Sequence, residues 1–131
     1  MGRFYHGDIE VKFWFAIQSS DDASFFGGNE EDDEEEQALN YFFGKEDLEE
    51  INGGLEKCKH QIFLLGYISV DVLDSYFETI DGWNEDMVSK ALGVKRDNVK
   101  EMLTWYARYG LGSKIKACVE EKGQCAFSAE L

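Results

Sequence analysis

The chain has 131 residues, a formal net charge of −14, 44% hydrophobic residues and 15% aromatic residues. This length suits a single domain, 1–131, and the apolar content excludes a disordered chain whose acidity prevents folding. No run of 18 apolar residues occurs, and acidic residues at positions 8 and 10 interrupt the N-terminal segment. We therefore expect a cytoplasmic protein with neither a signal peptide nor a membrane partner.

The acidity is concentrated in the N-terminal part of the chain. Residues 1–50 contain three basic and fifteen acidic side chains, a balance of −12, whereas residues 51–131 contain ten and twelve, a balance of −2. A field of this sign repels nucleic acid and anionic membranes and attracts basic surfaces. Direct binding of nucleic acid is therefore less favoured than binding of a basic protein.

The segment 8–44 has the pattern of a β-hairpin. Residues 8–18, DIEVKFWFAIQ, alternate apolar and polar side chains, which predicts a half-buried strand. Residues 39–43, LNYFF, predict a second strand that ends at Gly44. Between them, residues 19–37 are rich in Ser, Asp, Gly and Glu, so we expect a long acidic loop at the tip of a hairpin.

The segment 46–122 has helical periodicity. Apolar residues spaced by three and four predict helices over about 46–65, 70–80, 84–92, 96–109 and 113–122, with a break or kink expected at Gly53 and Gly54. Cys58 and Cys118 fall on inward faces and are expected in the core, and the three cysteines show no CxxC spacing.

Residues 125–131, CAFSAEL, alternate again and predict a terminal strand that pairs with the hairpin. The fold class is therefore α+β, a small antiparallel sheet packed on four to five helices. The sheet should contribute the following residues to the core: Phe13, Phe15, Ile17, Phe42 and Phe127. An exposed edge at 39–43 or 125–131 would also support a homo-oligomer.

Residues 88–99, VSKALGVKRDNV, resemble the helix-turn-helix of DNA-binding proteins. The resemblance covers about residues 84–106 and rests on the positions of Ser89, Gly93, Val94 and Val99. It implies that a second helix presents these residues to a major groove: Lys95, Arg96, Asn98, Lys100 and Thr104. Residues 84–131 carry eight basic and seven acidic side chains, however, and lack a basic stripe. A purely structural role is the favoured interpretation, since a fold element does not establish a function.

The run GGNEEDDEEEQ at 27–37 has three interpretations: a solvated loop, a loose cation site, or a surface that imitates the phosphates of nucleic acid. It lacks the spaced ligands and the glycine of an EF-hand, so we expect no metal site and no cofactor. Blocks of like charge are often solvated, and often bind partners. The candidate partner-binding residues are Asp21, Asp22, Glu30, Glu31, Asp32, Asp33, Glu34, Glu35 and Glu36.

A metal-dependent hydrolase is the second alternative. His6, Asp8 and Glu10 lie close together in sequence, and Asp21 and Asp22 could join them. Alternating polar residues on the solvent face of a strand give the same pattern. No nucleophile motif, phosphate loop or HxxxH spacing accompanies them, so we expect no catalytic residues.

The favoured hypothesis is therefore a small, acidic, non-enzymatic interaction protein that engages a basic, nucleic-acid-binding protein through its N-terminal region. Small size, an acidic end and the lack of a catalytic motif are typical of phage or viral inhibitors of host nucleases. A DNA-binding regulator that uses residues 84–109 is the first alternative.

Overall fold

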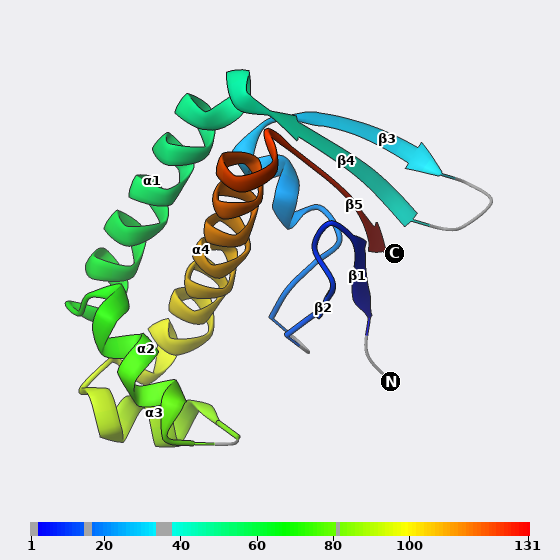
Figure 1. Ribbon diagram of the computed structural model, residues 1–131. Helices are drawn as coiled ribbons and strands as arrows, with labels where there is room; N and C mark the ends of the chain where they lie inside the picture. The colour runs from blue at the N-terminus through cyan, green and yellow to red at the C-terminus, as the bar shows by residue number, and fades with distance from the viewer. Residues whose placement is uncertain (1–2, 15–16, 34–37, 81) are drawn as a thin grey trace.

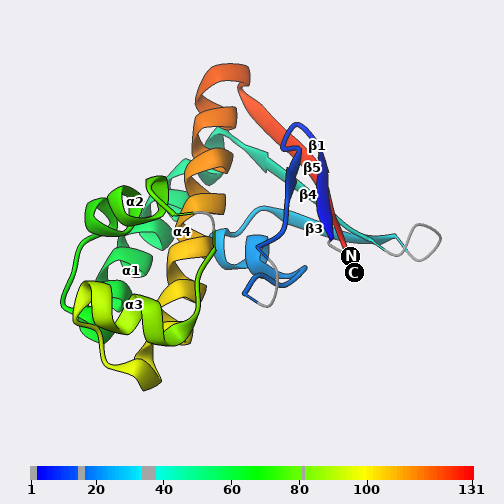
Figure 2. The same cartoon turned by 90° about the horizontal axis from the view of Figure 1, so that it is seen from below.

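The computed structural model describes residues 3–14, 17–33, 38–80 and 82–131, excepting the side chains of residues 29–33. The α+β class is confirmed: an antiparallel sheet packs against helices (Figures 1 and 2). The strand order is β2-β1-β5-β4-β3. The strands are β1 (Phe4–Gly7), β2 (Val11–Lys12), β3 (Asn29–Asp33), β4 (Ala38–Gly44) and β5 (Gln124–Glu130). The helices are α1 (Leu48–Gly66), α2 (Val70–Glu78), α3 (Glu85–Leu92) and α4 (Arg96–Lys122), with 3-10 turns η1 (Asp22–Phe26) and η2 (Lys45–Asp47).

The sheet contains an N-terminal hairpin, as predicted, but the hairpin is formed by β3 and β4, so the assignment of its strands to 8–18 and 39–43 with an acidic loop at 19–37 is wrong. The structure describes residues 8–14, 17 and 18 of segment 8–18, and among these only the two residues of β2 are in a strand, which pairs with β1 and not with β4. The partner of β4 is β3, which lies inside the predicted loop, and η1 precedes it. The alternation of segment 8–18 instead reflects burial without a ladder, since Ile9, Phe13 and Ile17 are all buried.

The C-terminal strand is central and not peripheral. β5 pairs with β1 on one side and with β4 on the other, and β4 pairs with β3 and β5. Residues 39–43 and 125–130 are therefore in strands that have a neighbour on both sides and offer no edge for a second chain. The edges of the described sheet are β2 and β3.

Two predicted breaks in the helices do not occur. α1 continues through Gly53 and Gly54, and α4 replaces the two helices expected at 96–109 and 113–122, continuing through Gly110 and Gly112. The ends of the helices agree better with the sequence predictions than the expected breaks do. The Asn84 side chain accepts a hydrogen bond from the Met87 amide (2.9 Å), and Gly93 ends α3 with φ of 69°.

Two of the helix glycines have a packing role. The Phe26 ring is fully buried where α1 and α4 approach each other. A Cβ at Gly54 would lie 2.7 Å from Cδ1 of Phe26, and a Cβ at Gly112 would lie 2.4 Å from its Cε1 and Cζ. Each glycine costs its helix about 1 kcal/mol relative to alanine. That cost is offset because the lack of a Cβ at these two glycines leaves the space that the ring fills.

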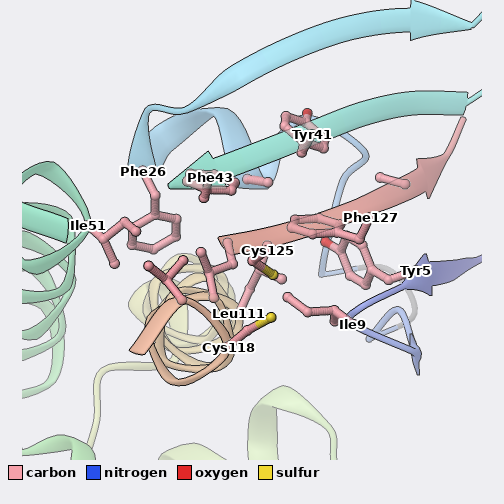
Figure 3. Packing of buried hydrophobic residues seen from close by; sticks show 14 of the residues in the cluster. Tyr5, Ile9, Phe26, Tyr41, Phe43, Ile51, Leu111, Cys118, Cys125 and Phe127 are labelled. Atoms are coloured by element: carbon pink, nitrogen blue, oxygen red, sulfur yellow. The ribbon is translucent and has the colours of Figure 1, made fainter. Parts of the chain in front are cut away.

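The core consists of two clusters connected by α1 and α4. One cluster lies between the sheet and these helices and includes Phe26, Phe43 and Phe127 (Figure 3). The other lies among α2, α3 and the adjoining parts of α1 and α4, and includes Ile62, Leu73 and Met102. The C-terminal half of α4 serves the first cluster and its N-terminal half the second.

The predicted sheet core is partly correct. Phe13, Ile17 and Phe127 are buried, and Phe15 lies outside the described residues. Phe42, in contrast, is 37% exposed. Side chains alternate between the faces of a strand, and Tyr41 and Phe43 occupy the buried face of β4, so Phe42 lies on the open face of the sheet.

Candidate functional site

Residues 29–33 of the acidic run form the outermost strand of the sheet on one side. Residues 30–33 pair with β4 in a continuous register from Glu30 with Tyr41 to Asp33 with Ala38. β3 follows β4 at the end of the strand order and projects with it away from the helices (Figure 1). Three of the candidate residues, Glu34, Glu35 and Glu36, lie outside the described residues.

Asp21 and Asp22 have different environments although they are adjacent. Asp21 is exposed and accepts a hydrogen bond from Ser19 Oγ (2.5 Å). Asp22 is 2% exposed and its Oδ1 lies 3.2 Å from Nη2 of Arg108 on α4. Its Oδ2 also accepts from the Ser19 amide (3.1 Å). The assignment of Asp22 to a partner-binding surface is therefore wrong, because its charge is used inside the fold.

Arg108 completes this buried pair. Its guanidinium lies over the rings of Phe25 (5.0 Å) and Trp105 (4.7 Å). Its Nε is buried and has no hydrogen-bond partner among the described residues. Asp22 is the residue whose carboxylate it contacts, so the pair fixes η1 against α4.

The side chains considered for a metal-dependent hydrolase are not brought together. His6 Nε2 lies 2.9 Å from Glu130 Oε2, and Asp8 Oδ1 lies 3.6 Å from Lys122 Nζ. Asp22 faces Arg108 instead. Within residues 3–14, 17–33, 38–80 and 82–131, no group of three or more His, Cys, Asp or Glu side chains could hold a metal ion. The geometry gives no support to this alternative.

The helix-turn-helix pattern corresponds to α3, the turn at Gly93, and the start of α4. Ser89 Oγ donates to the Val94 carbonyl (2.7 Å), and Val94 and Val99 are buried. The residues on which the resemblance rests therefore all form the turn or pack against it. This is the structural role that the sequence favoured.

The candidate DNA-binding residues are partly engaged within the protein. Arg96 Nε donates to Asp86 Oδ1 (2.6 Å), and Asn98 Nδ2 donates to the Leu65 carbonyl at the end of α1 (3.1 Å). Thr104 Oγ1 donates to the Lys100 carbonyl (2.9 Å). Lys95 and Lys100 are exposed. Their surroundings include exposed acids, so this surface lacks a basic stripe.

The cysteines have no features of reactive thiols. Cys58, Cys118 and Cys125 are free and buried, as expected for the first two. Burial raises the pKa of the Cys58 thiol to about 12, so it is protonated at neutral pH and is a poor nucleophile.

Sequence reasoning missed the neighbour of the acidic strand. Phe42 is the register partner of Asn29 and lies on the open face, where Asn40 and Ser128 contact each other through Oδ1 and Oγ. The signal was present: Tyr41 and Phe43 are both large and apolar, so an aromatic between them must occupy the opposite face. An exposed aromatic side chain thus adjoins the acidic edge.

The fold and the site together define an α+β protein with an acidic sheet edge. No protein-family model, curated protein or solved structure matches this chain. Among the described residues, no helix is long and apolar enough to cross a membrane.

Proposed function

We propose that the protein is a small, non-enzymatic interaction protein that binds a basic, nucleic-acid-binding protein through strand β3, as a phage- or virus-type inhibitor would. The observation that carries the proposal is the position of residues 30–33 in an edge strand. A rigid scaffold thereby supports four consecutive acidic residues that a solvated loop would leave without fixed spacing.

The spacing of charge along β3 supports imitation of nucleic acid. An antiparallel strand rises about 3.4 Å per residue. One strand of a DNA duplex carries one phosphate per about 3.4 Å of helix axis. Residues 30–33 are acidic without interruption, so the charge per unit length of the strand, summed over both of its faces, is about that of a DNA strand. A groove that is complementary to phosphates is the kind of surface that this density fits.

The edge position adds a second mode of contact. An edge strand has backbone N–H and C=O groups that do not pair within its own sheet, and extended peptides bind such edges by strand addition. Carboxylates on the same strand favour a partner segment rich in Lys and Arg. Phe42, exposed on the open face beside β3, supplies an aromatic contact of the type that anchors interfaces.

The direct test neutralises the edge strand. In a variant that carries Glu30→Gln, Glu31→Gln, Asp32→Asn and Asp33→Asn, affinity for a basic protein captured from source-cell lysate should fall at least about 10-fold, because the charges that attract the partner are removed. Binding by the parent should also weaken between about 50 and 300 mM salt. Quantitative capture on immobilised protein, after nuclease treatment, measures both effects.

The matched control carries the same change of net charge elsewhere. Glu78, Glu101, Glu120 and Glu121 are exposed on helices, and their replacement by Gln should leave the affinity within about 2-fold. Equal losses in the two variants would mean that only the total charge matters. Unchanged affinity in the edge variant would leave β3 as a charged edge that prevents aggregation, without a partner.

A DNA-binding regulator is the alternative, and α3 with α4 supplies its geometry. The acidic partners of Arg96 and the internal bond of Asn98 disfavour it. We expect no retention of duplex DNA by the parent at about 50 mM salt, measured by mobility shift. Retention that is lost with Arg96→Ala and Lys100→Ala combined would favour the regulator and contradict the proposal.

A further inference from the structure

The C-terminal end of α1 carries an exposed apolar patch. Phe63, Leu64 and Tyr67 are 54%, 51% and 80% exposed. Their spacing of three and four residues places them on one face of the last helical turn, where the rings of Phe63 and Tyr67 meet edge to face (6.1 Å between centroids). The opposite face of the same turn packs into the core through Ile62, which is fully buried. The patch is therefore a separate outer surface of the helix.

The backbone of Tyr67 is in the left-handed region. Its φ of 55° and ψ of 30° end α1, and among the described residues it is the one residue other than glycine with a positive φ. Glycine and asparagine adopt this conformation more readily than tyrosine does. Because the Tyr67 ring is largely exposed, burial inside the protein does not offset the cost of its backbone. A contact with another molecule would offset it.

A hollow of about 290 Å³ adjoins the patch. Its lining comes from Lys59 and Phe63 of α1, residues 68–71 at the start of α2, and Tyr109 of α4. Lys59 Nζ lies 3.3 Å from Glu56 Oε1 and 5.8 Å from the centroid of the Tyr109 ring. The surface beside Phe63 is therefore concave and partly apolar, and it can receive an apolar side chain of a bound molecule.

The distribution of charge permits a second copy to approach the patch. Segment 56–72 contains two basic and two acidic residues, a balance of zero, whereas residues 1–50 have a balance of −12. The patch end of α1 and the acidic strand β3 lie at opposite ends of the molecule (Figures 1 and 2). Charges more than about 8 Å apart are largely screened at physiological salt. Two copies that meet at the patch therefore keep their acidic ends apart, while a basic partner is attracted to β3 instead.

The patch is also self-complementary. When two α1 helices cross antiparallel about a two-fold axis between residues 63 and 64, Phe63 of one copy faces Leu64 of the second copy. The same axis brings His60, which is exposed one turn earlier, to Tyr67 of the second copy. Apolar and aromatic side chains thus face each other across the axis, without acidic residues between them.

The exposed area agrees with a weak dimer. A Phe or Tyr side chain has about 150–250 Å² of surface, so at their exposed fractions Phe63 and Tyr67 together present about 200–330 Å². The two rings then contribute about 400–660 Å² to a two-fold contact, and Leu64 with the polar rim brings the total toward the about 1,000 Å² of a weak, reversible complex. Exposed apolar patches of a few hundred Å² commonly mark interfaces.

We propose that the protein forms a weak symmetric dimer through Phe63, Leu64 and Tyr67, with α1 of one copy antiparallel to α1 of the second copy. Such a dimer presents two β3 edges at its opposite ends, which would raise the avidity for a partner with two basic sites. The patch is on different elements from β3, so the dimer goes beyond the proposed interaction with a basic protein. The two can fail independently, because dimerisation is measured on the protein alone.

Sedimentation equilibrium of the full chain at physiological salt tests the dimer. We expect a Kd of about 10–100 µM. The double variant Leu64→Gln with Tyr67→Asn should raise this Kd at least about 10-fold, because it removes two of the three apolar side chains. Its Tm should not fall, since both side chains are exposed and asparagine suits the left-handed position.

The matched control removes exposed apolar side chains elsewhere. Met87→Gln combined with Leu131→Gln should dimerise within about 2-fold of the parent, because both residues are exposed outside the patch. A parent that remains monomeric at about 500 µM would overturn the proposal. Equal dimerisation by the parent and the Leu64→Gln, Tyr67→Asn variant would overturn it as well.

Cross-linking locates the axis of the dimer. Leu64→Cys places a thiol beside the axis and should form a disulfide between two copies when diamide is the oxidant, whereas Met87→Cys should not. The natural cysteines, Cys58, Cys118 and Cys125, are buried, so the parent should not cross-link. Dimerisation of Leu64→Cys without this disulfide would assign the contact to another face and contradict the proposal.

Discussion

Replacing Asp22 with alanine should lower the free energy of unfolding by about 3 kcal/mol, although the residue belongs to an acidic, surface-like sequence. The variant leaves Arg108, whose side chain is only 22% exposed, without the carboxylate that its guanidinium contacts at 3.2 Å. It also removes the acceptor of the Ser19 amide, which helps to shape the chain before η1. Urea unfolding followed by circular dichroism measures the loss.

The neighbouring carboxylate provides the control for this prediction. Asp21→Ala removes the same charge from an exposed position and should change stability by no more than about 0.5 kcal/mol. The double variant Asp22→Ala with Arg108→Ala should lose less free energy of unfolding than the sum of the two single variants. Each single change leaves the other charged side chain without its partner, whereas the double change removes both. Equal effects of Asp21→Ala and Asp22→Ala would show that the buried pair does not hold η1 on α4.

Replacing Phe26 with alanine should lower the free energy of unfolding by about 3–5 kcal/mol, a large share of the total stability of a domain. The ring is fully buried in the slot made by Gly54 and Gly112, and its loss leaves a cavity between α1 and α4. Gly112→Ala should also destabilise, by about 1–3 kcal/mol, because its Cβ would overlap the ring. Urea unfolding of both variants checks the prediction.

The same slot gives a control and a stringent test. Gly53→Ala, at a position with open space, should stabilise the protein by up to about 1 kcal/mol. In the Phe26→Ala background the overlap with the ring no longer exists and the 2.9 Å approach to Cδ2 of Leu55 remains, so Gly112→Ala should destabilise the protein clearly less there than in the parent. If Gly112→Ala destabilises both backgrounds equally, the glycine is needed for a reason other than the ring.

Local signals in the sequence predicted the helical part of the fold well. The periodicity of α1, the Asn84 cap and the Gly93 terminus each depend on residues within one or two turns. The glycines of α1 and α4 misled the prediction because their reason is tertiary. Phe26 is distant from both Gly54 and Gly112 in sequence, and no local pattern reports that one ring fills the space beside two helices.

The sheet was harder to predict because strand pairing is not local. Segment 8–18 has the alternation of a strand, yet among its described residues only Val11–Lys12 forms a ladder, with β1. The acidic residues of β3 have low strand propensity, and their backbone is ordered by the ladder with β4. Strand propensity reflects only the intrinsic preference of each residue. The hydrogen bonds that hold a residue in a strand can instead come from the neighbouring strand.

The candidate site could be predicted in composition but not in geometry. Sequence identified the acidic run as the feature most in need of a function, but it placed residues 30–33 in a loop, whereas they belong to strand β3 and pair with β4. It could not separate Asp22 from Asp21, because burial of one of two adjacent carboxylates depends on Arg108, which is 86 residues away.

Hydrogen–deuterium exchange of the protein, alone and bound to the basic protein captured from source cells, tests the central claim most directly. If a basic segment of the partner binds at the sheet edge, amide exchange over residues 29–33 should slow in the complex, while exchange in α2 and α3 stays the same. Unchanged exchange over residues 29–33, with slowed exchange at α3 and the start of α4, would contradict the account and assign binding to the helix-turn-helix segment.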